Sequence, residues 1–170
     1  MTPFVDKVHA YFQGVHRDVF ADDPAANPYL SVEIVGAGLA DDTPVCVLIA
    51  PWTLCGLAAP PDARLPSALR IRNRHYPALS NEVDPIGSYW SVLLVPDVSH
   101  YAHQDELRVV AESLAVDFQK AVEKARRELT QVADRDRRLL LKGGSTRAGA
   151  VAVETAFGDP NGTKPQNDGA

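Results

Sequence analysis

The chain has 170 residues, of which 45% are hydrophobic and 23% charged, and its formal net charge is −5. These values fit one domain of usual size with a tail, and they are ordinary for a soluble globular protein. The acidic balance argues against a nucleic-acid or anionic-membrane partner and leaves room for a basic one.

Apolar residues recur at spacings of three and four between residues 4 and 20, which predicts an amphipathic helix. The members of this stripe are Val5, Val8, Phe12, Val15 and Val19. Alternation over residues 29–35 predicts a strand. The chain starts without a basic region followed by a long apolar stretch, so we expect no secretory signal and a cytoplasmic location.

Residues 45–60 form the most hydrophobic stretch of the chain, and Pro51-Trp52 interrupts it. The stretch is too short to cross a bilayer, so we expect two buried strands that meet at this corner. Cys46 and Cys55 lie within it, and a disulfide would require them to face each other across a tight hairpin. We expect two buried thiols in a reducing compartment, and we find no spacing typical of a metal site.

The middle of the chain gives weaker signals. Residues 65–69 suggest a short helical turn, and residues 76–84 a strand. Between them, basic residues alternate with other residues from Arg70 to His75. Charges at this period form either one solvated strand face or a small anion-binding patch.

Two strong signals follow. Residues 88–95 are aromatic and β-branched and stop at Pro96, which predicts a central strand. Residues 104–127 carry a long apolar stripe with acidic residues at the start and basic residues at the end, which predicts a helix. We therefore predict an α+β domain over residues 1–144. It contains a mainly antiparallel sheet of about five strands, flanked by an N-terminal helix and a long C-terminal helix. Residues 145–170 are predicted to be a flexible tail.

No residue pattern indicates catalysis. Ser99, His100 and Asp105 lie close in sequence, but a nucleophile elbow and a glycine-built oxyanion loop are both missing. Cys55 as a reactive thiol competes with the simpler interpretation of a small buried apolar residue. We therefore expect a protein that is not an enzyme and holds no cofactor.

Aromatic residues on the two best strands and acidic pairs in the loops are compatible with a binding surface. Such a surface would be an apolar groove with an acidic rim, suited to a peptide that carries arginines. Core aromatics and solvated loop acids are the alternative interpretation. The candidate partner-binding residues are Pro51, Trp52, Cys55, Tyr89, Trp90, Pro96, Asp22, Asp23, Asp41 and Asp42.

Several segments follow one another in order along residues 4–144. They are Asn27-Pro28-Tyr29-Leu30-Ser31-Val32-Glu33, Pro51-Trp52 within the apolar run, Gly87-Ser88-Tyr89-Trp90-Ser91-Val92-Leu93-Leu94-Val95-Pro96, the long helix, and Arg137-Arg138-Leu139-Leu140-Leu141-Lys142-Gly143. In their order and spacing they resemble the HybE-type [NiFe]-hydrogenase assembly chaperones. Ala50, Cys55 and Val95 depart from the Thr, Asn and Ser common in the family, and the rubredoxin-like module of some relatives is missing. The chain thus resembles a divergent member.

The resemblance implies a small cytoplasmic α+β protein that holds a hydrogenase subunit precursor during maturation. The subunit expected is the small one, and the segment expected to bind is its N-terminal twin-arginine export signal. The alternative is an accessory or structural subunit that stays in a mature hydrogenase or another oligomer.

Overall fold

The computed structural model describes residues 2–59 and 65–143. The chain divides into two units, Met1–Asp134 and Arg135–Ala170, and the fold below is that of the first. Its elements are α1 (Pro3–Val15), the π-helical turn η1 (His16–Phe20), β1 (Glu33–Ala40), β2 (Thr43–Ala50), β3 (Thr53–Ala58), β4 (Ala68–Ile71), β5 (Arg74–Val83), β6 (Gly87–Val95) and α2 (Gln104–Gly143), of which α2 continues into the second unit.

The strands form one antiparallel sheet in the order β1-β2-β3-β6-β5-β4. This confirms the predicted α+β class, with six strands where about five were expected. The predicted meeting of two strands at Pro51-Trp52 is confirmed, and these residues form a two-residue turn because Ala50 and Thr53 are paired across β2 and β3.

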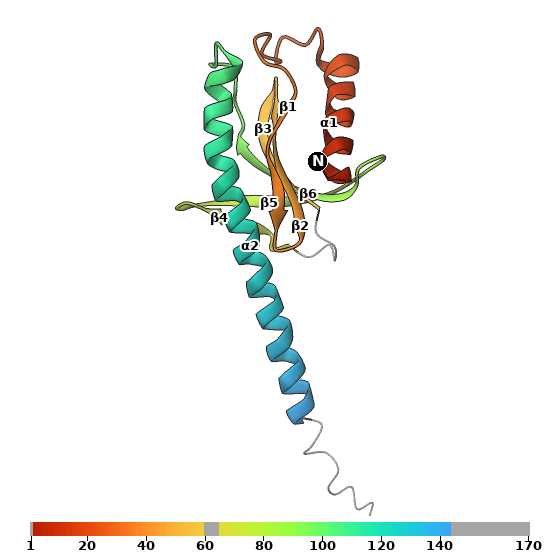
Figure 1. Cartoon of the computed structure of the whole chain (residues 1–170), viewed down its shortest axis with the longest axis vertical. Helices are drawn as coiled ribbons and strands as arrows, with labels where there is room; N and C mark the ends of the chain where they lie inside the picture. Colours follow the sequence, from red (N-terminus) through yellow and green to blue (C-terminus); the bar gives the residue numbers. More distant parts are fainter. Residues whose placement is uncertain (1, 60–64, 144–170) are drawn as a thin grey trace, which may run out of the picture. The chain divides into compact units, whose positions relative to one another are not determined.

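Strand β2 is buried on both faces, because a helix covers each side of the sheet there. One set of its side chains packs with Phe4, Val5 and Val8 of α1, and the alternate set packs with residues of α2. Figure 1 shows α1 and the first part of α2 on opposite sides of β1–β3. This explains why residues 45–50 are apolar without alternation, as expected for a strand with no solvent face.

The contact between α2 and the sheet centres on Phe118 and Gly56. Phe118 is almost fully buried, and a Cβ added at Gly56 would lie only 2.7 Å from its ring. Glycine at this position of β3 therefore allows the aromatic ring to lie directly on the strand backbone.

Two local predictions were wrong. The strand expected at 29–35 starts instead at Glu33, and it runs through the glycines that suggested a loop. The register shifts between Val35 and Gly38, and Gly36 has a φ of +59°, so a bulge accommodates them. The helical turn expected at 65–69 is also missing, since Ala68–Ile71 is a strand paired with β5.

Helix α2 is longer than the predicted span of 104–127. It continues to Gly143, and its residues from Gln131 to Lys142 are exposed. No glycine or proline occurs between residues 128 and 142, so no helix breaker ends it earlier. The predicted tail at 145–170 lies outside the described residues, and the predicted domain boundary stays a prediction.

An ion pair connects the edge strand β1 to α2. Arg108 donates to both carboxylate oxygens of Glu33, at 2.7 and 3.0 Å, and the Gln104 amide donates to the same group at 2.7 Å. These bonds, led by the one from Arg108, hold the pKa of Glu33 below its ordinary value of 4.5. The stabilisation is therefore fully present above that value and is lost as the pH falls through the lowered pKa.

We predict that Glu33→Gln lowers the free energy of unfolding at pH 7 by about 1 kcal/mol, since the pair is partly exposed to solvent. This corresponds to a melting temperature lower by about 2–5 °C. The difference from the parent should shrink as the pH falls below 4.5, which thermal melts across pH can check. Glu106→Gln, at an exposed position of α2, is the matched control. A constant difference at all pH values would contradict the assignment.

Candidate binding site

The site is built on the turn between β2 and β3. Pro51 is buried, and its carbonyl oxygen accepts a hydrogen bond from the Asn27 backbone N–H at 2.7 Å. Trp52 follows it and is only partly buried. A two-residue turn holds this large side chain at the end of the hairpin, where one part of the ring packs and another part contacts solvent.

The indole of Trp52 stacks on the ring of Phe20. Their centroids are 4.1 Å apart and their planes differ by 16°, and the His16 ring lies 6.1 Å from Trp52. Phe20 and His16 are the two ends of the π-helical turn η1. One extra residue per turn is rare in helices and is frequent at functional sites. Here it accompanies two rings that both contact the tryptophan.

Beside this stack lies an open cavity of about 510 Å³. His16 and Phe20 line it on one side, and the loop that leads to β1 lines the rest with Asp22, Asp23 and Leu30. Asp22 is exposed, and the carboxylate of Asp23 accepts a hydrogen bond from the Ala25 N–H at 2.8 Å. The cavity therefore combines an aromatic wall with two carboxylates.

Asn27 fixes the loops around the cavity, although in the sequence it stands out only within the segment that carries the family resemblance. Its buried side chain donates to the carbonyls of Val98 and Tyr101, at 2.9 and 2.8 Å, and accepts from the Tyr29 N–H at 2.9 Å. Its backbone bonds to Pro51, as described above. A buried asparagine with every bond supplied by backbone holds three segments in one arrangement. The Asn-Pro signal alone cannot indicate these distant partners.

The structure brings five of the predicted residues to this end of the first unit: Pro51, Trp52, Asp22, Asp23 and Pro96. Pro96 is exposed and follows Val95, whose carbonyl accepts a hydrogen bond from the Thr53 hydroxyl at 3.2 Å. Figure 1 shows the β2–β3 turn and the loop between α1 and β1 at the same end.

Three predicted residues lie elsewhere. Tyr89 is buried against α1, and burial raises its pKa, with smaller contributions from Tyr11 and Cys55. Trp90 faces the opposite side of the sheet and packs toward α2. Cys55 is partly buried on β3, where it pairs with Leu93.

The remaining pair, Asp41 and Asp42, forms the β1–β2 turn with φ values of +50° and +63°. This turn is at the other end of β2 from Pro51, about 25 Å away for a strand of this length. The structure therefore separates the two acidic pairs that the sequence analysis placed in one rim.

The described residues offer no group of three or more His, Cys, Asp or Glu side chains placed to hold a metal ion. Within the same part of the chain, we find no helix with the length and apolarity needed to span a membrane.

The two thiols are both free. Burial raises the pKa of Cys46 to about 12. Burial also raises the pKa of Cys55, and a contact with the Thr53 hydroxyl at 3.7 Å opposes this effect.

We predict slow reaction of both thiols with a disulfide reagent at pH 8, because only the thiolate reacts and raised pKa values make it scarce. Cys46 should react only on unfolding, and Cys55 should react faster than Cys46. Reagent-coupled absorbance in buffer and in guanidinium, with Cys46→Ser and Cys55→Ser variants, measures both. Immediate reaction of Cys55 in the folded protein would contradict this environment.

Comparison with known families supplies one match. A family model described as "[NiFe]-hydrogenase assembly, chaperone, HybE" matches residues 4–143. This agrees with the resemblance found in the sequence. No curated protein and no solved structure matches the chain significantly.

Proposed function

Since the chain belongs to the HybE family of [NiFe]-hydrogenase assembly chaperones, we propose that it binds the precursor of the small hydrogenase subunit in the cytoplasm during maturation. Family membership makes the protein an assembly chaperone and not an enzyme. The proposal concerns which subunit it holds and which surface holds it.

The observation that carries the proposal is the cavity beside the Trp52–Phe20 stack. Partly buried aromatic rings give a large contact area for an apolar segment at small entropic cost. Asp22 and Asp23 at the same cavity add negative charge that suits arginines. A segment with a basic head and an apolar body, such as a twin-arginine export signal, complements both features.

Pro51 and Asn27 hold the loops next to the cavity in place, and Pro96 is an exposed residue at the same end of the first unit. Pro51 and Asn27 are buried and joined by a hydrogen bond, so they fix the position of Trp52. We assign to Cys55, Tyr89 and Trp90 the weaker role of maintaining the sheet under this end. Asp41 and Asp42 form a separate acidic turn at the other end of β2. Only a partner large enough to extend from the cavity to this turn would contact both.

We predict that Trp52→Ala reduces capture of the small-subunit precursor at least about tenfold in a quantitative pull-down from the native host, because it removes the ring that stacks on Phe20 beside the cavity. Phe20→Ala should act similarly, and it keeps the β2–β3 turn intact. Trp90→Phe, which faces the other side of the sheet, is the matched control and should capture normally. Thermal melts must show that each variant is folded, so that a loss of capture is not due to unfolding.

Normal capture by both folded alanine variants would remove this cavity from the site. Mass spectrometry of the eluate also tests the partner. Recovery of the precursor without its metal cofactor supports a chaperone function. Recovery of the mature, cofactor-loaded enzyme indicates a retained accessory subunit.

The acidic rim has its own test. We expect Asp22→Asn/Asp23→Asn to weaken binding of a synthetic peptide with two adjacent arginines and an apolar segment by about tenfold at low salt, with a smaller effect at high salt. Asparagine can still accept the bond that Asp23 receives from Ala25. Glu106→Gln/Glu112→Gln removes the same charge from α2 and should bind normally. Equal binding by both double variants would exclude a charge contribution from the loop.

A further inference from the structure

The β4–β5 hairpin concentrates positive charge on a protein whose net charge is −5. Residues 66–78 contain Arg70, Arg72, Arg74 and His75 and no acidic residue. Arg72 is committed to α2, since it donates to Asp117 at 2.6 Å and to Ser113 at 2.8 Å. That contact fixes the hairpin against the helix and leaves Arg70 available.

Strand β4 is an edge of the sheet, and its register shows which backbone groups face outward. Ala78 donates to the carbonyl of Ser67 at 2.9 Å, so Ser67 and Ala78 form a hydrogen-bonded pair. In an antiparallel ladder such pairs alternate with non-bonded ones. The pairs Ala68–Pro77 and Arg70–His75 are therefore non-bonded, which agrees with proline lacking an N–H.

The N–H and C=O groups of Ala68 and Arg70 thus point away from β5. Within residues 2–59 and 65–143 these outward groups have no backbone partner. Unpaired backbone groups at a sheet edge are a template for an added strand.

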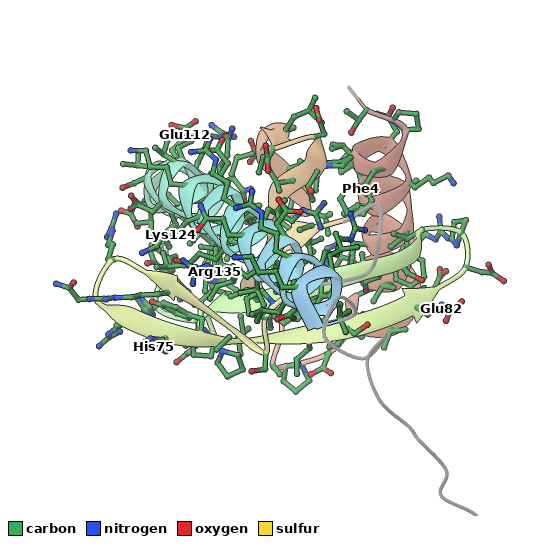
Figure 2. The ribbon with its side chains drawn as sticks, turned by 90° about the horizontal axis from the view of Figure 1, so that it is seen from below. Phe4, His75, Glu82, Glu112, Lys124 and Arg135 are labelled. Carbon is green, nitrogen blue, oxygen red and sulfur yellow. The ribbon has the colours of Figure 1, made fainter. Side chains whose placement is uncertain are left out.

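An open cavity of about 260 Å³ lies at this edge, between β4 and α2. Its lining includes apolar surface from Leu69 and Ala121, together with Arg70, His75, Lys124 and Glu128. Lys124 and Glu128 are 3.9 Å apart, so the single carboxylate is already next to a cation. Figure 2 shows Lys124 and His75 on the same side of the molecule, at the far end of β5 from Glu82.

The two faces of β4 differ in chemistry. Leu69 and Ile71 are buried in the core that packs on α2, whereas Arg70 and its register partner His75 are exposed and line the cavity at the edge of the sheet. A strand added beside β4 would lie along this cavity, which presents apolar surface from Leu69 and Ala121 and basic groups from Arg70, His75 and Lys124.

We propose that this edge binds an extended polypeptide segment in which apolar and acidic residues alternate. The segment adds as a strand beside β4, bonds to the outward groups of Ala68 and Arg70, and sets its carboxylates against the Arg70–His75 face. This surface is distinct from the cavity at Trp52, and the inference does not depend on the function proposed there.

A labelled heptapeptide, Val-Glu-Val-Glu-Val-Glu-Val, tests the proposal with the full chain, using fluorescence anisotropy at low salt. We expect saturable binding. Arg70→Glu should weaken it at least about tenfold, because it reverses the charge that faces the carboxylates. Ala68→Pro should weaken it similarly by removing one outward N–H that β5 does not use. Lys7→Glu, on α1, is the matched control, and Trp52→Ala should also bind normally.

Binding that is no weaker in Arg70→Glu, or equal binding of the lysine version of the peptide, would overturn the proposal. So would the absence of saturation at millimolar peptide. If Ala68→Pro fails to fold, a peptide with proline at its central position makes the same backbone test from the other side, and unchanged affinity would contradict strand addition.

Discussion

The burial of β2 on both faces is the constraint on which the rest of the fold depends. A strand without a solvent face needs a layer on each side, and α1 and α2 supply these two layers. Both helices are amphipathic and require an apolar surface to cover. Because the helices meet the sheet at β1–β3, the two-residue turn after β2 emerges at the boundary between them. Trp52 is partly exposed as a result, and it contacts Phe20 at the end of the helix that covers its face.

The same arrangement leaves the other half of the sheet less covered. Strands β5 and β4 extend beyond the layer formed by α1, and their exposed residues include Leu79 and the basic groups near Arg70. The described part of the chain thus carries two chemically opposite surfaces. One is aromatic and acidic, at the β2–β3 turn, and the other is basic with a free strand edge, at the β4–β5 hairpin. A chaperone that holds an unassembled polypeptide can use both, because two weak contacts on one chain reinforce each other.

The elements with strong periodicity were predictable from the sequence. The paired strands around Pro51-Trp52 and the strand at 88–95 are confirmed, because each buries apolar side chains. The helix predicted from residue 4 to residue 20 is α-helical only to Val15, and Val19 of its apolar stripe is exposed in the π-helical turn that follows. The predictions for residues 65–71 and for the glycines of β1 were wrong, since a helical turn and a loop were expected where the structure has strands. Strand pairing with β5 and a bulge decide those regions, and both depend on contacts distant in sequence. The α+β class and the family likeness therefore followed from pattern, whereas strand order did not.

The candidate site shows what the sequence patterns could not predict, which is the set of residues that lie close together in space. The sequence suggests one acidic rim from Asp22, Asp23, Asp41 and Asp42, because both acidic pairs lie in predicted loops. A strand has two ends about 25 Å apart for eight residues, and only the first pair lies at the end where Trp52 emerges. Phe20 was counted as the limit of a helix, yet the π-helical turn makes it the residue that stacks on the tryptophan. Asn27 joins three loops by its side chain. Charge and aromaticity indicate which residues suit a binding surface, but the direction of the strands decides which of them can contact the same partner.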